Sequence, residues 1–369
     1  MSIQKLGNYI RQVDTRNTEK KVSLLLGVSI EKQFIESIAN TIGTDMSTYK
    51  IVHKGQFAYG PVTSRNGDKV SIALLEQEEC IISSSYTVFE ITDTKVLLPQ
   101  YLMLWFRRPE FDRYARFHSH GSAREIFDWD ELCNVLLPVP AIDEQKAIVK
   151  RYADIEHRIT LKRKINDNLE AIAQAVYEEL IQDESNQTGG KIIDLAETIV
   201  CGKTPSTKDP KNFQGSIPFI TIPDMHEGRY CIKTERSLSR MAASNRIPAN
   251  SICVSCIASA GLVCICEVES QTNQQINSIV CKPGIDFYFV YFKMKELSGF
   301  IRQIGSCGST TCNLSKSEFS NIDIKIPSIS AQADFSKKVT PLFNQIRENQ
   351  KEIIALEKLK SVLLSKISQ

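Results

Sequence analysis

The sequence contains an internal repeat, and this feature limits the possible folds more than any other. Shifting the chain by 187 residues aligns residues 99–182 with residues 286–369 without a gap, and about 15 of the 84 aligned positions are identical. Unrelated sequences would share only about a third as many. The repeated positions include Gln145 with Gln332, and Ser119-His120-Gly121-Ser122 with Ser306-Cys307-Gly308-Ser309. The chain is therefore predicted to fold as two similar units related by a pseudo-two-fold axis.

Each repeat ends in a long helical pattern. A short apolar stretch ending in proline, at 135–140 and at 322–327, comes before it. Apolar side chains then recur at alternating spacings of four and three, which is typical of coiled coils. They are Ile148, Tyr152, Ile155, Ile159, Leu169, Ile172, Val176 and Leu180 in the first tract, and Phe335, Val339, Leu342, Ile346, Ile353, Leu356, Leu359, Leu363 and Ile367 in the second. Thr340 before Pro341 has the pattern of a helix start, so we expect the second long helix to begin or kink there.

Polar residues and net charge indicate how the two helices pair. Lys162 and Asn349 occupy equivalent positions in the two stripes, and Asn166 adjoins Ile165. These residues either are buried and fix the register, or lie at a solvated edge of the stripe. Residues 131–190 have a net charge of −4 and residues 314–369 a net charge of +3, so the tracts attract each other. We expect antiparallel packing within one chain.

The length and composition allow two globular domains. The chain has 369 residues, of which 42% are hydrophobic. The predicted boundaries are 1–130 for the first globular domain, 131–186 for the first long helix, 187–313 for the second domain and 314–369 for the second helix. Short strands are expected within 50–57, 80–91 and 251–268, and a helix near 101–115. The predicted fold class is α+β, with two similar mixed α/β domains separated by two long antiparallel coiled-coil helices.

Cysteine usage and hydropathy favour a cytoplasmic protein. The chain has 11 cysteines, an odd number, and residues 1–10 contain no apolar core of a signal sequence, so reduced thiols are expected. The longest uncharged stretch, 247–266, has 20 residues, but a proline, an asparagine and three serines interrupt it, so it lacks the ~20 predominantly apolar residues that a membrane span needs. Cys253, Cys256, Cys264 and Cys266 could bind zinc, but the last two are separated by one residue only, which favours packing in the core. No metal site is predicted.

Motifs of catalysis and cofactor binding are missing from the sequence. Gly202-Lys203-Thr204 matches the end of a phosphate-binding loop, but Glu197 stands where its first glycine should be. The chain also has neither a Gly-x-Gly-x-x-Gly fingerprint nor the Asn/Asp-Pro-Pro-aromatic motif of amino-methyltransferases. We therefore predict no catalytic and no cofactor-binding residues in this chain.

A basic segment in the first half is the best candidate for contact with DNA. Residues 107–124 carry a net charge of +3 before their two histidines are counted. Arginine can contact phosphates and can bind guanine with two hydrogen bonds, although a solvated helix face would explain the same residues. The candidate DNA-binding residues are Arg65, Asn66, Arg107, Arg113, Arg116, His118, Ser119, His120, Ser122 and Arg124 in the first half, and Lys203, Thr204, Ser206, Lys208, Ser309, Thr310 and Thr311 in the second.

The boundary between domain and helix resembles a known family. Leu137-Pro138-Val139-Pro140-Ala141-Ile142-Asp143-Glu144-Gln145, followed by Ile148 and a long helix, is similar to the conserved region of specificity subunits of type I restriction-modification systems. Residues 324–332 repeat it more weakly, with Ala331 in place of Glu144. Gly202-Lys203-Thr204-Pro205, Ile217-Pro218-Phe219-Ile220, Asn273-Gln274 and Gly308-Ser309 extend the resemblance over the second half.

The resemblance implies a subunit with two target recognition domains. Each would read one half of an asymmetric, bipartite site in double-stranded DNA, and the two helices would act as a ruler between them. The helices would also dock two adenine-methyltransferase subunits, and the assembly would recruit ATP-dependent restriction subunits. S-adenosylmethionine, magnesium and ATP would then belong to these partners, and this chain would be non-catalytic. The alternative is a two-headed protein-interaction scaffold with a coiled-coil spacer, whose affinity for DNA would be weak, independent of sequence and lost at moderate salt.

Overall fold

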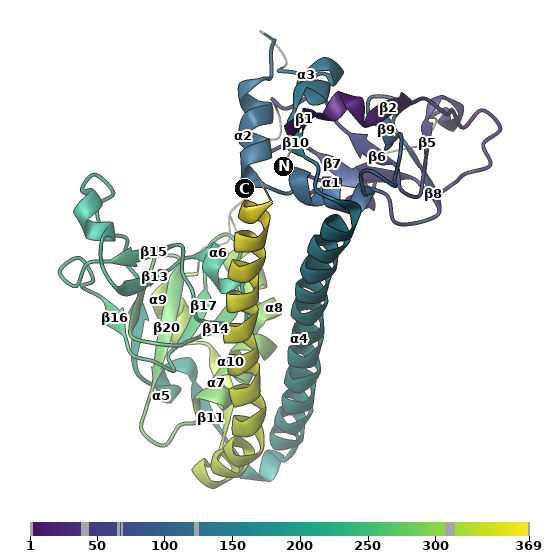
Figure 1. Ribbon diagram of the computed structural model, residues 1–369. Coiled ribbons are helices and arrows are strands. Elements are labelled where there is room, and N and C mark those ends of the chain that lie inside the picture. The colour runs from purple at the N-terminus through teal and green to yellow at the C-terminus, as the bar shows by residue number, and fades with distance from the viewer. Residues whose placement is uncertain are drawn as a thin grey trace. The chain divides into compact units, whose positions relative to one another are not determined.

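The computed structural model divides the chain into two compact units. It describes residues 3–37, 44–64, 67, 69–121, 125–306 and 314–367. Unit 1 comprises Met1–Arg158 with Leu356–Gln369, and unit 2 comprises Ile159–Ala355. Each of the two longest helices, α4 (Ile142–Gln182) and α10 (Ile329–Lys366), contributes residues to both units (Figure 1). The predicted boundaries at 130, 186 and 313 stay predictions.

Unit 1 is built around an antiparallel sheet with the strand order β2-β9-β6-β7. The strands are β2 (Ile10–Val13), β9 (Thr87–Ile91), β6 (Phe57–Tyr59) and β7 (Ile72–Leu74). Helices α1 (Pro99–Phe106) and α2 (Pro109–Phe117) pack against it, and in the core Phe57 stacks on Phe89 with ring centroids 4.9 Å apart. The hairpin of β3 (Leu26–Val28) and β4 (Phe34–Glu36) and the antiparallel pair of β5 (Lys50–His53) and β8 (Glu79–Ile82) form a smaller core together with residues of the main sheet.

Unit 2 repeats this arrangement. Its main sheet has the order β12-β20-β17-β18-β14, and the first four strands match those of unit 1 in order and direction. They are β12 (Ala196–Cys201), β20 (Ile276–Cys281), β17 (Ile252–Ser255) and β18 (Val263–Cys266), followed by β14 (Tyr230–Cys231). Helices α7 (Phe287–Glu296) and α8 (Ser298–Ser306) correspond to α1 and α2. The predicted internal duplication is confirmed, and it extends into the sheets.

The junction before each long helix is also repeated. In unit 1, α3 (Trp129–Asn134) leads into β10 (Leu136–Pro138), which pairs with β1 (Ile3–Lys5). In unit 2, α9 (Lys316–Ser320) leads into β21 (Asp323–Pro327), which pairs with β11 (Gln187–Lys191).

Unit 2 has a further sheet of β15 (Arg236–Leu238), β13 (Ile217–Ile220), β19 (Ser270–Thr272) and β16 (Arg246–Ile247). The short helices are η1 (Leu6–Asn8), η2 (Met46–Thr48), η3 (Glu184–Asn186), α5 (Ile192–Leu195), η4 (Pro210–Phe213) and α6 (Ile222–Met225).

The buried glutamines of the two repeats tie each long helix to its own domain. Gln145 accepts from the Leu98 amide at 2.9 Å and donates to the Pro140 carbonyl at 2.9 Å. Gln332 accepts from the Asp286 amide at 3.1 Å and donates to the Pro327 carbonyl at 2.8 Å. The repeated glutamine therefore fixes the first turn of each helix to the loop before α1 or α7.

The two long helices pack antiparallel within each unit, as predicted. In unit 1, Lys360 of α10 donates to Glu156 of α4. In unit 2, Lys162 lies 2.7 Å from Glu352, and Asn166 accepts from Asn349 at 2.8 Å. Higher numbers in α4 meet lower numbers in α10, which defines the antiparallel direction.

Some details of the predicted helices are wrong. The second long helix does not start at Pro341, because α10 begins at Ile329 and Pro341 lies inside it. The solvated-edge interpretation is wrong for Asn166 and Asn349, each of which is 2% exposed. Ile172 and Leu359, which were expected in the stripe, are exposed. The buried positions of α4 recur every seven residues in two series, one of Gln145, Tyr152, Ile159, Asn166 and Ala173 and one of Glu170 and Tyr177.

The globular elements are shorter than the patterns indicated. Each of the ranges 50–57, 80–91 and 251–268 contains a turn between two strands, and the helix expected near 101–115 is divided in two at Arg107-Arg108, before Pro109.

Cys231, Cys253, Cys264 and Cys266 lie in one apolar cluster of unit 2, which confirms the prediction of core packing for the last three. In the described ranges, no group of His, Cys, Asp or Glu is arranged to hold a metal ion. None of the described helices is long and apolar enough to cross a bilayer.

Candidate nucleic-acid interface

In unit 1, two of the predicted arginines, Arg113 and Arg116, lie on α2. The helix has acidic residues in its first turn and Arg116 in its last, which suits the helix dipole. The Arg113 guanidinium lies 3.0 Å from Glu110 and is mostly exposed, and Arg116 pairs with Glu125. Both ion pairs are open to solvent and therefore weak, so these arginines can exchange a carboxylate for a phosphate at little cost.

The side chains of the three candidate residues that follow α2 differ in how firmly their neighbours hold them. The His118 ring stacks on Tyr114 at 4.2 Å, and its Nδ1 lies 3.1 Å from Glu131. The Ser119 hydroxyl donates to the Ala115 carbonyl at 2.7 Å and accepts from Thr63 at 2.9 Å. The His120 backbone pairs with Ile126, and its side chain, whose Nε2 lies 3.8 Å from Glu131, is 71% exposed. His120 is thus better placed for a ligand than His118 or Ser119.

Arg107 has a different position from the other candidates. It follows the last residue of α1, and its guanidinium lies over the Tyr152 ring of α4 at 5.5 Å. Both residues line a cavity of about 520 Å³ in unit 1, together with Lys32 and Glu156. The structure therefore places Arg107 against the long helix and not with Arg113 and Arg116 on α2.

In unit 2 the structure brings together two motifs that are far apart in the sequence. The Lys203 amide donates to the Thr272 carbonyl at 3.0 Å, and the Thr204 hydroxyl donates to the Gln274 side chain. The neighbouring Gln271 amide group donates to the Lys203 carbonyl at 2.7 Å. The loop that begins at Gly202 is therefore held on the turn after β19.

The rest of this loop is exposed. Lys203, Ser206 and Lys208 all have exposed side chains, and Ser206 accepts from the Lys208 amide at 3.4 Å. The Ser206 carbonyl also accepts from Asn212 at 2.9 Å, which braces the loop against η4. A single loop, held by the turn after β19 and by η4, thus carries Lys203, Thr204, Ser206 and Lys208.

Seven candidate residues lie outside the described residues. They are Arg65, Asn66, Ser122, Arg124, Ser309, Thr310 and Thr311.

Two exposed apolar residues were not predicted as candidates. Phe117 at the end of α2 is 81% exposed, and Met241 is 96% exposed. Each directly follows an arginine, Arg116 or Arg240. Apolar side chains beside cations can stack on bases or wedge between them. The sequence could have predicted that Phe117 is exposed, because Phe117 does not lie on the helix face formed by the buried Phe111 and Ala115.

The architecture defines a class of protein with two like α+β domains, each followed by one helix of an antiparallel pair. The model of one family, the type I restriction modification DNA specificity domain, matches residues 31–171 and again residues 187–358. The chain therefore belongs to this family. Each match covers most of one copy of the structural repeat.

Individual relatives agree with this assignment. The specificity subunit of the type I restriction enzyme HindI from Haemophilus influenzae is 25% identical, over 98% of this chain and 96% of the relative. The MjaIX specificity subunit from Methanocaldococcus jannaschii is 34% identical over 185 residues, which cover 46% of this chain and 42% of the relative. The crystal structure of a type I S subunit from M. genitalium has the same fold, with a TM-score of 0.62 at 13% identity, over 99% of this chain and 95% of the other.

Proposed function

We propose that this chain reads a bipartite, asymmetric DNA target, one half-site with each globular domain. The observation that carries the proposal is that the family's specificity domain occurs twice and that each occurrence coincides with one copy of the structural repeat. Two diverged domains in one chain can recognise two different short sequences, and their linkage raises the effective concentration of the second domain once the first has bound.

The candidate contact residues suit this role. In the first domain, Arg113, Arg116 and His120 would approach phosphates or base edges, with Phe117 among them. In the second domain, the loop with Lys203 and Lys208 would do the same. Phosphate contacts would orient each domain, and contacts to base edges would give the sequence preference.

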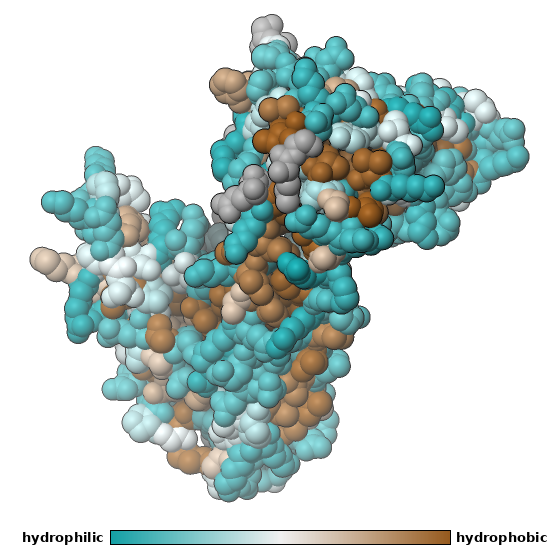
Figure 2. Space-filling model, in the orientation of Figure 1, coloured by the Kyte–Doolittle hydropathy of each residue, from teal (hydrophilic) through white to brown (hydrophobic). Residues whose placement is uncertain are grey.

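A second part of the proposal concerns the partner subunits. Leu161, Ile165 and Ile172 on α4 are exposed, and their spacing places them on one face of the helix. Figure 2 shows hydrophobic side chains along this part of the surface. An exposed apolar stripe of this kind supports the docking of partner helices. We propose that two adenine-methyltransferase subunits bind to the helix pair and that ATP-dependent restriction subunits join the assembly.

The proposed division of labour places catalysis on the partners. S-adenosylmethionine, magnesium and ATP would be bound by the methyltransferase and restriction subunits, and this chain would supply specificity without catalysing a step. The missing sequence motifs of methyl transfer and nucleotide binding support this division.

The decisive experiment is a binding selection from random-sequence DNA. The purified assembly of this chain with its methyltransferase subunits is expected to enrich a split motif, two short defined sequences separated by a gap of fixed length. A variant with Lys203→Ala and Lys208→Ala should bind more weakly while it keeps the first half of the motif. Weak binding without any enriched motif, lost at moderate salt, would defeat the proposal and favour the scaffold.

A further inference from the structure

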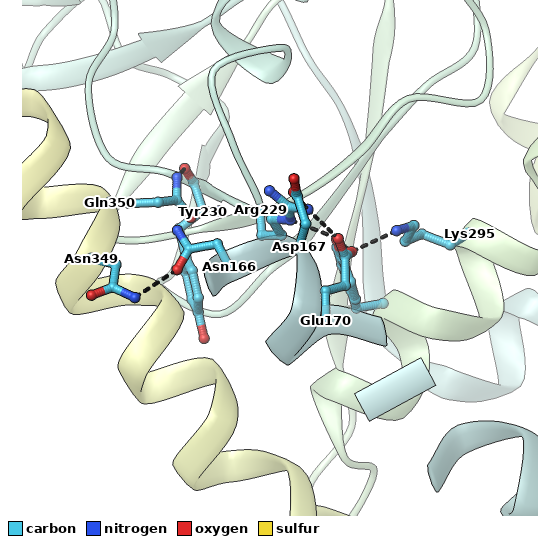
Figure 3. A network of polar contacts seen from close by, with 9 residues as sticks. Asn166, Asp167, Glu170, Arg229, Tyr230, Lys295, Asn349 and Gln350 are labelled. Carbon is cyan, nitrogen blue, oxygen red and sulfur yellow. Dashed lines mark hydrogen bonds and ion pairs between the residues drawn. The ribbon is translucent and has the colours of Figure 1, made fainter. Parts of the chain in front are cut away.

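One segment of α4 makes polar contacts with two different neighbours within unit 2. Its side chains are Lys162, Asn166, Asp167 and Glu170, here called the α4 lock. Asp167 and Glu170 contact the second globular domain, whereas Asn166 contacts α10 (Figure 3). Lys162 also contacts α10, through Asn349. The same segment therefore determines how α4 fits against the domain and how it fits against the other helix.

On the domain side, Glu170 is the centre of the network. It is 8% exposed, and both of its carboxylate oxygens are used. Arg229 Nε donates to Oε2 at 2.6 Å, and the Tyr291 hydroxyl and Lys295 Nζ donate to Oε1 at 2.7 and 2.5 Å. Arg229 also donates to Asp167 at 2.7 Å. Two carboxylates thus bind two cations that come from separate parts of the domain, α7 and the loop before β14.

The residues next to Arg229 are held by α10. The Gln350 side chain accepts from the Tyr230 amide at 3.1 Å and donates to the Tyr230 carbonyl at 3.1 Å. A Cβ on Gly228 would lie 1.9 Å from Gln350 Nε2, so a side chain at residue 228 would displace the Gln350 amide group from its bonds to Tyr230. Three consecutive domain residues are therefore fitted closely to the helix pair.

On the other side, the lock fixes α4 to α10. Asn349 donates to Asn166 at 2.8 Å, and its own carbonyl oxygen accepts from Lys162 at 3.0 Å and from Gln345 at 3.0 Å. Lys162 also lies 2.7 Å from Glu352. Because Asn166 and Asn349 are buried, a shift of one helix along the other would leave polar groups without partners in the interior.

The lock permits one register where apolar packing alone would permit several. A shift of α4 by one turn moves Glu170 by about 5.4 Å along the axis, beyond the reach of Arg229, Tyr291 and Lys295 together. Burial disfavours the charged form of Glu170, but its hydrogen bond and charge interaction with Lys295, and the charge of Arg229, outweigh this effect and lower its pKa from the ordinary 4.5. A displaced Glu170 would lose these partners while still largely buried, which is strongly unfavourable.

The lock belongs to only one copy of the repeat. Shifted by 187 residues, Lys162 corresponds to Asn349 and Glu170 to Glu357, but Asn166 and Asp167 correspond to Ile353 and Ile354. Asn166 and Asp167 of the lock are therefore not repeated in the second tract, where the corresponding residues are apolar. Simple duplication of the unit does not explain this asymmetry.

We propose that the α4 lock sets the gap between the two half-sites, with Glu170 as the positioning residue that couples the second domain to the register of the helix pair. This inference rests on the proposed function and deepens it. The lock would contribute to gap selectivity, which is the preference for one gap length, and not to the reading of bases within either half-site.

The test uses the full chain in its methyltransferase assembly, with the split motif selected by the wild type as the probe. Affinity is measured for that target, for targets with the gap changed by one base pair, and for targets with single base changes in each half. In Glu170→Gln, affinity for the correct target should fall about tenfold and the penalty for a changed gap should shrink to about threefold or less. The penalties for base changes should stay within about twofold of wild type. The matched control is Glu178→Gln on the exposed face of α4, which should leave all three measurements unchanged.

A second variant and a DNA-free measurement separate the possible failures. Gln350→Met leaves the charged cluster intact, removes the contacts to Tyr230 and should reduce gap selectivity in the same way. Hydrogen exchange at 228–231 and along α7 should be faster in Glu170→Gln than in Glu178→Gln. Wild-type gap selectivity in both Glu170→Gln and Gln350→Met, or unchanged hydrogen exchange in Glu170→Gln, would overturn the inference. If the wild type selects no split motif, the proposed function fails, and the exchange measurement still tests the lock.

Discussion

At Gly202 the backbone passes so close to the neighbouring turn that a side chain has no room. A Cβ there would lie 2.0 Å from the Asn273 carbonyl oxygen and 2.3 Å from the Thr272 hydroxyl. The Gly202 amide also donates to the Ile276 carbonyl at 3.1 Å, so the residue cannot move away without losing this bond. The close approach presents Lys203 and Thr204 at the surface beside Gln274.

Gly202→Ala should therefore destabilise unit 2 and displace the loop. We expect the free energy of unfolding to fall by about 1–3 kcal/mol, because the clash is with backbone atoms that cannot rotate away. The control is Gly189→Ala, since nothing lies within 4 Å of a Cβ at Gly189. Urea unfolding of both variants measures the effect, and equal stability of the two would show that the loop accommodates a methyl group without strain.

The candidate interface was predictable from sequence only in part. The polarity of Lys203, Thr204 and Ser206 indicated an exposed loop, but the contact of Thr204 with Gln274 depends on sheet pairing between distant strands. Arg107 looked equivalent to Arg113 in sequence, yet the break between α1 and α2 places its guanidinium over Tyr152. Residue type predicted charge and exposure, whereas tertiary contacts decided which residues share a surface.

Helix α10 contains a proline in its interior, a position where proline is unfavourable. Pro341 lies within the helix although it has no amide hydrogen, so the Lys337 carbonyl lacks its usual partner. Pro341 and Lys337 are both exposed, and water can therefore solvate this carbonyl. The adjacent Val339 and Phe343 are fully buried in the core of unit 2, and their packing holds the helix together across the proline.

Pro341→Ala should stabilise the chain because it restores the missing hydrogen bond. We expect the free energy of unfolding to rise by about 1–3 kcal/mol, in line with the cost of proline in a helix interior. Ser361→Ala, at another exposed position of α10, is the control and should change it by no more than about 0.5 kcal/mol. Thermal unfolding monitored by circular dichroism measures both, and a lower stability of Pro341→Ala would indicate that the proline has a structural purpose.

The long helices could be predicted from the sequence more fully than the strands. Both long helices and their antiparallel pairing were predictable, because the apolar stripe and the repeat persist over many turns. Most of the predicted stripe is buried or half-buried, including Tyr152 and Ile159, but Ile172 is apolar and exposed, whereas Asn166 is polar and buried. Binary patterning assumes that polar residues face water, and it fails where polar partners such as Asn166 and Asn349 satisfy each other inside. The strands were harder to predict, because a turn within 251–268 interrupts a largely apolar run.

At the scale of the whole molecule, duplication explains both the likeness and the difference of the two units. The four-strand order, the pair of helices and the buried glutamine occur twice, and these features establish the scaffold. The additional sheet formed by β15, β13, β19 and β16, and the α4 lock, belong to unit 2. A shared scaffold with different surface elements is what two domains need if they are to read different half-sites from one chain.

If the helix pair acts as a ruler, its length should set the gap in the DNA target. We propose removing seven residues from each helix at paired positions, 155–161 from α4 and 354–360 from α10. Seven residues preserve the period of the buried positions and shorten each helix by about 10 Å. The selected split motif should then have the same two half-sites and a gap shorter by about three base pairs, given a rise of about 3.4 Å per base pair. Duplicating the same segments should lengthen the gap by the same amount. A gap that stays constant in both variants would refute the ruler, because the spacing would then be set by something other than the length of the helices.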